Sequence, residues 1–182
     1  MRKIIFFLVT MTTLVWAEPQ VFLGFGGGST AEKFSSESIN KTVTGYHGKV
    51  TAGYGDRKAY LVQIGLSYIQ YDQNIFSSND GYNLYLDIDL IKAFDFGIGF
   101  YPFVKAGFGA GKMKVDRSVQ SELGNGDFHL GGGVYVPLGK YVDLEISFVS
   151  KGKNWERVNL LATDEEVKSA AIEPYFGINF RY

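Results

Sequence analysis

Two histidines carry the acid–base chemistry that this sequence could perform near neutral pH. They are His47 and His129, and Asp127 lies two residues before the second. A carboxylate that orients an imidazole is the arrangement of an activated general base. Residues two apart in a strand also face the same side, so the pair can equally form a structural hydrogen-bond network. We favour the network and expect no catalytic residue.

Two further features suggest ligand chemistry. The segment Gly24-Phe25-Gly26-Gly27-Gly28-Ser29 is glycine-rich, as phosphate-binding loops are, but it lacks a following lysine and does not open a helix. Asp87 and Asp89 could bind a cation or pair with lysine and arginine side chains. We favour the pairing and expect neither a metal site nor a cofactor.

Composition narrows the class of protein. The 182 residues contain no cysteine, which excludes disulfides, cysteine-ligated metals and a lipid anchor on an N-terminal cysteine. The net charge is −1, so there is no basic field for nucleic acid. After the N-terminus, no stretch approaches the ~18 consecutive apolar residues of a membrane helix. Average polarity is uninformative for a β-barrel, whose strands alternate apolar and polar positions.

The N-terminus has the order of a secretory signal peptide. Arg2 and Lys3 precede an apolar stretch over 4–9 and 14–16, and Val15-Trp16-Ala17 fits a cleavage site. We expect a signal peptide over 1–17 and one barrel domain over 18–182. An uncleaved anchor helix is the alternative.

Period-two alternation recurs along the rest of the chain. It predicts eight strands, at 20–29, 43–55, 58–70, 81–91, 101–114, 126–137, 141–150 and 171–182. Short turns alternate with longer polar connections, as in an up-and-down barrel. The predicted fold is all-β, an eight-stranded antiparallel up-and-down transmembrane β-barrel.

The last long connection, 151–170, is the longest. Thr163-Asp164-Glu165-Glu166 in it matches a helix capping box, and a solvated acidic stretch is the equal alternative. Trp155 and Arg157 suit a recognition surface, although an exposed Trp155 would also suit the membrane interface. We expect that a short Gly-Ser turn can replace 153–168 without loss of folding.

One face of each predicted strand is free of charge, as Ile64, Leu66 and Leu86 illustrate. A charge on the lipid side costs about 2–4 kcal/mol at mid-membrane, so the charged face must point inward. The expected lumenal polar network consists of Lys49, Asp87, Asp89, Lys105, Asp127, Asp143, Glu145, Glu173 and Arg181. Acids outnumber bases in this set, so any flux through the narrow lumen should prefer cations.

The C-terminal octapeptide Tyr175-Phe176-Gly177-Ile178-Asn179-Phe180-Arg181-Tyr182 resembles the terminal assembly signal of outer-membrane barrels, which usually ends in Phe. The segment 102–111 resembles the fifth strand of OmpA-like and opacity-type (porin-like) barrels. The resemblance implies the outer membrane of a Gram-negative envelope and assembly through Gly177, Phe180 and Tyr182. It implies three partners: outer-membrane lipid, lipopolysaccharide and the barrel-assembly machinery.

Three classes of function are compatible with such a barrel. The first is a structural or surface-interaction role, with a surface or host ligand bound through the loops. The second is a narrow passive channel. The third, a lipid-modifying enzyme, needs His, Ser and an acid on the lipid side, and the outward faces carry none of these. We expect the first class and no enzymatic activity.

Overall fold

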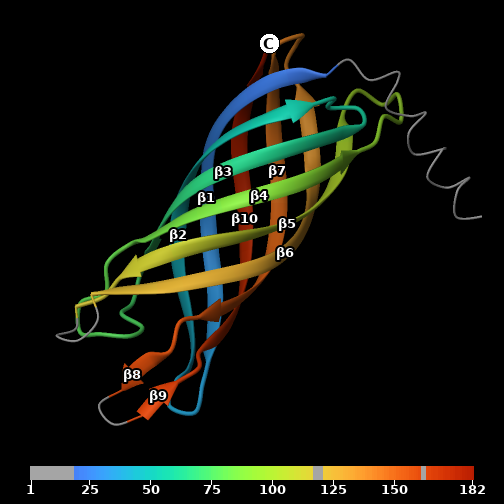
Figure 1. Cartoon of the computed structure of the whole chain (residues 1–182). Helices are drawn as coiled ribbons and strands as arrows, with labels where there is room; N and C mark the ends of the chain where they lie inside the picture. The colour runs from blue at the N-terminus through green and yellow to red at the C-terminus, as the bar shows by residue number, and fades with distance from the viewer. Residues whose placement is uncertain (1–18, 117–120, 161–162) are drawn as a thin grey trace, which may run out of the picture.

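Alternating inward and outward residues form eight long strands that close into a barrel (Figure 1). The computed structural model describes residues 19–116, 121–160 and 163–182, so the predicted signal peptide lies outside them. The barrel strands are β1 (Gln20–Ser35), β2 (Asn40–Gly55), β3 (Tyr60–Tyr71), β4 (Asn83–Ala93), β5 (Tyr101–Lys114), β6 (Glu122–Pro137), β7 (Val142–Trp155) and β10 (Lys168–Arg181).

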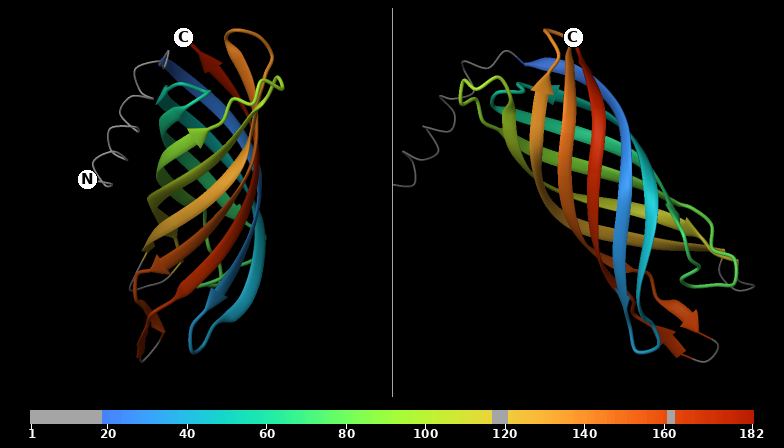
Figure 2. Two further views of the ribbon diagram at one scale, coloured as in Figure 1. Left: turned by 90° about the vertical axis from the view of Figure 1, so that its right-hand side faces the viewer. Right: turned by 180° about the vertical axis from the view of Figure 1, so that it is seen from behind.

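Every neighbouring pair of barrel strands is antiparallel, and β10 closes the barrel against β1. Figure 2 shows β10 in red beside β1 in blue. In this seam Gly26 lies opposite Gly177, and a Cβ on Gly177 would lie 2.7 Å from the Tyr175 ring. The predicted fold class is confirmed. Within the described residues, no helix is long and apolar enough to cross a membrane.

The strands extend further toward the long loops than predicted. The expected loop at 30–42 is wrong, because β1 runs to Ser35, β2 begins at Asn40, and only 36–39 connect them. Glu32 and Phe34 continue the inward row and are fully buried. The outward residues beside them are polar or small. The alternation of apolar outward and polar inward residues, on which the prediction was based, is therefore lost in this part of the strands.

The expected loop at 151–170 is also largely strand. A small hairpin, β8 (Val158–Leu160) and β9 (Thr163–Glu165), projects beyond the barrel (Figure 1). The capping-box helix is therefore wrong. Glu165 instead accepts hydrogen bonds from the hydroxyls of Ser36 and Ser38 and from the Ser38 N–H, which fastens the hairpin to the β1–β2 connection.

The outward faces form an apolar belt. Ile64, Leu66 and Leu86 are each about half exposed, and tyrosines 46, 54 and 68 are exposed at its edges. The belt matches the face predicted to be free of charge.

Leu86→Arg is expected to reduce the free energy of unfolding by about 2–4 kcal/mol, because the guanidinium would enter the apolar belt. Leu138→Arg is the matched control, since Leu138 is exposed in the β6–β7 turn and should change stability little. Urea unfolding in lipid vesicles measures both. Equal effects would show that Leu86 does not face lipid.

Candidate functional site: the sealed interior of the barrel

The barrel interior has three layers: an apolar cluster at each end and a column of charged side chains between them. The turn end carries the C-terminus and the connections 56–59, 94–100 and 138–141, and the loop end carries the longest connections together with the short one at 36–39 (Figure 1). This order follows from the inward-facing residues, which are apolar near both strand ends and charged in the middle.

At the turn end, a cluster fills the lumen, made of Phe22, Leu61, Ile91, Ala93, Phe103 and Tyr135. The Arg181 side chain is fully buried in it, with its guanidinium carbon 5.1 Å from the centre of the Phe22 ring. Its Nε donates to Asp143. Arg57 reaches in from the β2–β3 turn and places Nη1 2.6 Å from Asp143 Oδ1. Asp143 thus holds two arginines across the end of the barrel.

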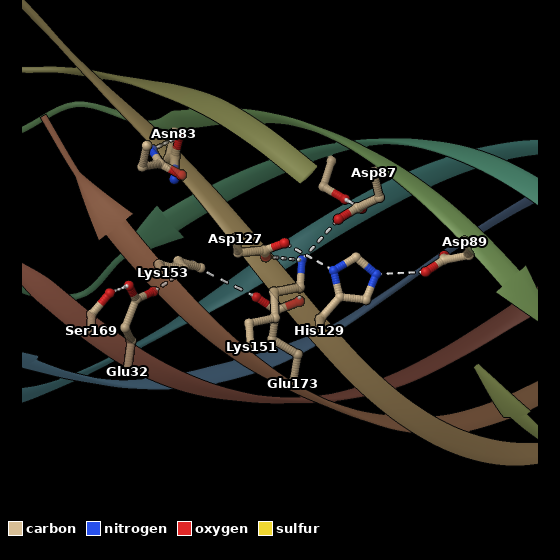
Figure 3. A network of polar contacts seen from close by, with 12 residues as sticks. Glu32, Asn83, Asp87, Asp89, Asp127, His129, Lys151, Lys153, Ser169 and Glu173 are labelled. Carbon is tan, nitrogen blue, oxygen red and sulfur yellow. Dashed lines mark hydrogen bonds and ion pairs between the residues drawn. The ribbon is translucent and has the colours of Figure 1, made fainter. Parts of the chain in front are cut away.

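Lys151 is the centre of the charged column (Figure 3). Its Nζ lies 3.1 Å from a carboxylate oxygen of Asp87, 3.1 Å from one of Glu173 and 4.0 Å from one of Asp127. Lys49 approaches Asp87 from the other side, at 2.9 Å. These carboxylates come from three different strands, so a single ammonium group joins them.

His129 continues the column between two carboxylates. Its Nδ1 lies 2.9 Å from Asp127 Oδ1, and its Nε2 lies 2.6 Å from Asp89 Oδ1. Both ring nitrogens are therefore in hydrogen-bonding contact with a carboxyl group. A general base needs a free ring nitrogen, which His129 does not have. The predicted network, rather than a catalytic pair, describes this contact.

The donor atoms of Asp87, Asp127 and His129 lie within 4.8 Å of one another, which is close enough to hold a metal ion. Lys151 already supplies a cation to both carboxylates, and the histidine is bonded on both sides. The geometry therefore favours an ion-pair network over a metal centre.

Two further groups complete the column. Glu145 lies 3.7 Å from Lys105 Nζ and accepts a hydrogen bond from Asn179 Nδ2 at 3.2 Å. Nearer the loop end, Glu32 lies 2.7 Å from Lys153 Nζ and accepts a 2.6 Å hydrogen bond from the Tyr71 hydroxyl. Each of these carboxylates is buried and has a cation beside it.

His47 is also buried in the interior, where its ring stacks on Tyr175 with centroids 6.1 Å apart. Among the predicted network residues, the structure brings together Lys49, Asp87, Asp89, Asp127 and Glu173 around Lys151 and His129. Lys105 with Glu145, and Arg181 with Asp143, form separate contacts nearer the turn end.

The loop end is closed by aromatic residues. The Trp155 indole lies 5.0 Å from the Phe76 ring and 5.6 Å from the Phe34 ring, between centroids. Its Nε1 donates to Ser169 Oγ at 2.8 Å. Trp155 is only 4% exposed, so its predicted place on the surface or at the membrane interface is wrong. It is part of the cluster that seals the lumen.

The excess of lumenal acids over lysines and arginines is smaller than predicted. Four charged residues were missing from the predicted set: Glu32, Arg57, Lys151 and Lys153. The column and its ends then hold seven acids (Glu32, Asp87, Asp89, Asp127, Asp143, Glu145, Glu173) against six lysines and arginines (Lys49, Arg57, Lys105, Lys151, Lys153, Arg181).

Side chains occupy most of the column. A cavity of about 20 Å³ lies among His47, Lys49, Asp87, His129 and Lys151, which is room for about one water molecule. Side chains therefore fill most of the lumen at the level of this cavity.

Solved structures share this architecture. Neisserial surface protein A superposes with a TM-score of 0.61 and 18% identity, covering 88% of this chain and 97% of that one. The chain has the fold of a small outer-membrane β-barrel. Ail of Yersinia pestis (TM-score 0.53, 14% identity, 91% and 99% covered) and OprG of Pseudomonas aeruginosa (0.53, 11%, 90% and 96%) are similar too.

No protein-family model matches the sequence, and neither does any curated protein. An apolar belt around a closed barrel of this fold is the surface of a protein that spans the outer membrane. The turn end is then periplasmic and the loop end extracellular.

Proposed function

We propose that the protein is an integral outer-membrane barrel that presents a fixed extracellular surface and conducts no solute. The sealed interior is the observation that supports this most strongly. Two apolar clusters close the ends, and buried ion pairs fill the space between them. Such a filling opposes a continuous water path, so it favours interaction through the loops over a channel.

The extracellular connections are ordered by contacts with one another. Asp80 accepts hydrogen bonds from the backbone N–H groups of Ile75 and Phe76, and these two residues are buried in the loop-end cluster. The Ser38 hydroxyl, which donates to Glu165, holds the pKa of that carboxyl below its ordinary value. A surface ordered before binding loses less entropy when a partner docks.

The exposed charges at this end bear on the kind of partner. Ail has been solved with the heparin analogue sucrose octasulfate. Here the exposed acids and bases are nearly balanced: Glu37, Asp72, Asp116, Glu122, Glu156 and Glu166 against Lys33, Lys112, Lys114, Arg157 and Lys168. A polyanion needs a basic field, so the described surface favours a partner of mixed polarity.

Assembly is proposed to depend on the C-terminal strand, through recognition of Gly177, Phe180 and Tyr182 by the barrel-assembly machinery. Phe180 and Tyr182 project from the outer surface, and Phe180 stacks on Phe25 across the β1–β10 seam. Outward aromatic residues at a strand end are accessible to a partner before the barrel closes.

Planar-bilayer recording tests the proposal. The purified protein should leave the conductance of the bilayer unchanged, while a larger porin inserted in the same way gives clear steps. Adhesion assays on cells that display the protein should then detect a partner that is lost when 158–164 is replaced by Gly-Ser. Steady, ion-selective conductance would favour the channel instead.

A further inference from the structure

The acidic residues at the extracellular edge of the barrel wall are not all paired with a cation. The Lys112 ammonium is paired, since it lies 3.4 Å from Glu122 with both side chains exposed. Glu156 is exposed as well, and its Oε2 accepts a 2.8 Å hydrogen bond from the Gly124 N–H, which fixes the carboxylate in place. Within the described part of the chain, no lysine or arginine forms an ion pair with Glu156. One negative charge is therefore uncompensated.

Glu156 lies at the end of an apolar groove. The groove has a volume of about 630 Å³ and crosses strands β3 to β7, within the ~300–1,000 Å³ typical of small-molecule sites. Its floor is a row of paired outward residues that become smaller toward β6, namely Leu66, Leu86, Ala110 and Gly126, and the row ends at Asn154 on β7. The groove is thus apolar along its length and acidic at one end.

The charges at this end discriminate between head groups. A phosphate would lie beside the unpaired carboxylate of Glu156 and would have to displace Glu122 from Lys112. An ammonium group could instead bind Glu156 through a charge-assisted hydrogen bond and leave the Lys112–Glu122 pair intact. The Asn154 amide lines the same end, and its oxygen can accept a further N–H. The site therefore favours a ligand with a net positive charge.

We propose that this groove binds a single-chain amphiphile with a positively charged ammonium head, taken up from the extracellular side. The head lies against Glu156, and the alkyl chain crosses Gly126 and Ala110 toward the leucines. Four intervals between neighbouring strands give a length of about 19 Å, which accommodates an extended chain of about twelve carbons. The charge complementarity at Glu156 separates this ligand from the anionic lipids that surround any outer-membrane barrel.

The apolar floor can be tested at Gly126, because a side chain there fits the protein and fills the groove. A Cβ on Gly126 would meet only the Gly109 carbonyl oxygen, at 3.7 Å. Gly48 is the matched control, since a Cβ there meets nothing within 4 Å and Gly48 does not line the groove. Ala110→Leu fills the same floor, should Gly126→Leu fail the gel-mobility test of folding.

Native mass spectrometry of the folded protein, released from a neutral detergent, measures the retention of three probes: dodecylammonium, dodecanol and dodecyl phosphate. The unchanged protein and Gly48→Leu should retain one dodecylammonium, and should retain it more strongly than either other probe. Gly126→Leu should weaken this retention about tenfold, because the leucine displaces methylenes from the groove.

The acidic end is tested by charge removal. Glu156→Gln keeps an acceptor for the Gly124 N–H and should weaken dodecylammonium about threefold, as expected for an exposed ion pair, while dodecanol is unaffected. Glu37→Gln is the control, because Glu37 is an exposed acid outside the groove. Lys112→Gln should strengthen dodecylammonium, since it removes a nearby cation and frees Glu122.

Equal retention of dodecylammonium by the groove-filling variants and Gly48→Leu would overturn the site. Retention of dodecyl phosphate at least as strong as that of dodecylammonium would overturn the assigned ligand, and so would equal effects of Glu156→Gln and Glu37→Gln. These outcomes do not depend on whether the extracellular loops have a partner or the lumen conducts.

Discussion

Lys151→Met is expected to reduce the free energy of unfolding by about 3–5 kcal/mol or to prevent folding, because it leaves Asp87 and Glu173 buried without their shared cation. Urea titration in lipid vesicles measures the loss. Lys168→Met is the control: Lys168 pairs with Glu166 on the exposed surface, and its loss should cost at most about 0.5 kcal/mol.

A compensated variant separates charge from packing. Lys151→Met combined with Glu173→Gln removes one carboxylate together with the cation and leaves Asp87 paired with Lys49. Stability should recover in part, because neutral amides are less costly to bury than unpaired carboxylates. If Lys151→Met were as mild as Lys168→Met, the column would be wet and its ion pairs replaceable by water.

Trp155→Ala is the second large effect, with an expected loss of about 3–5 kcal/mol, as for other buried tryptophans. The substitution would open the cluster with Phe34 and Phe76 and leave Ser169 without its indole donor. Thermal or urea unfolding in vesicles measures it.

Replacement of the extracellular hairpin is a second test of the loop-end cluster that contains Trp155. Replacing 158–164 with Gly-Ser removes the hairpin tip and should preserve folding and insertion. Replacing 153–168, which the sequence suggested would be harmless, removes Lys153 and Trp155 from the interior and should abolish folding. Heat-modifiable gel mobility distinguishes the two. Normal folding of the longer replacement would contradict the account of the loop-end seal.

The barrel itself could be predicted because membrane and lumen impose a strict alternation. Leu86 faces the membrane and Asp87 faces the lumen. A shift of one residue in the strand register would expose a carboxylate to lipid. The charged set on the inward face was therefore visible in the sequence before any contact between its members was known.

The loop-end seal could not be predicted in the same way. Lys151, Lys153 and Trp155 keep the inward alternation, but Gly152 and Asn154 between them are polar or small, because β7 has left the apolar belt there. Only the alternation of inward and outward residues, continued from Val149, could have predicted that these three side chains face the lumen. Ile75 and Phe76 are harder still, since they come from a loop without periodicity and are placed by Asp80.

The sequence also did not predict which lumenal side chains contact one another. The sequence predicted that Lys49 and Asp87 both face the lumen. It did not predict that Lys151 contacts Asp87, Asp127 and Glu173, because contacts across a lumen depend on the shear of the barrel. The position of His129 between Asp127 and Asp89 likewise depends on a contact across the lumen.

Thiol labelling tests most directly whether the lumen is sealed. The sequence contains no cysteine, so Ser67→Cys places a single small thiol beside Asp87 in the buried column. Ser78→Cys, at an exposed loop position, is the labelling control. With a charged methanethiosulfonate on both sides of the membrane, Ser78→Cys should react completely and Ser67→Cys should stay unmodified. Rapid modification of folded Ser67→Cys would show an open, water-filled lumen.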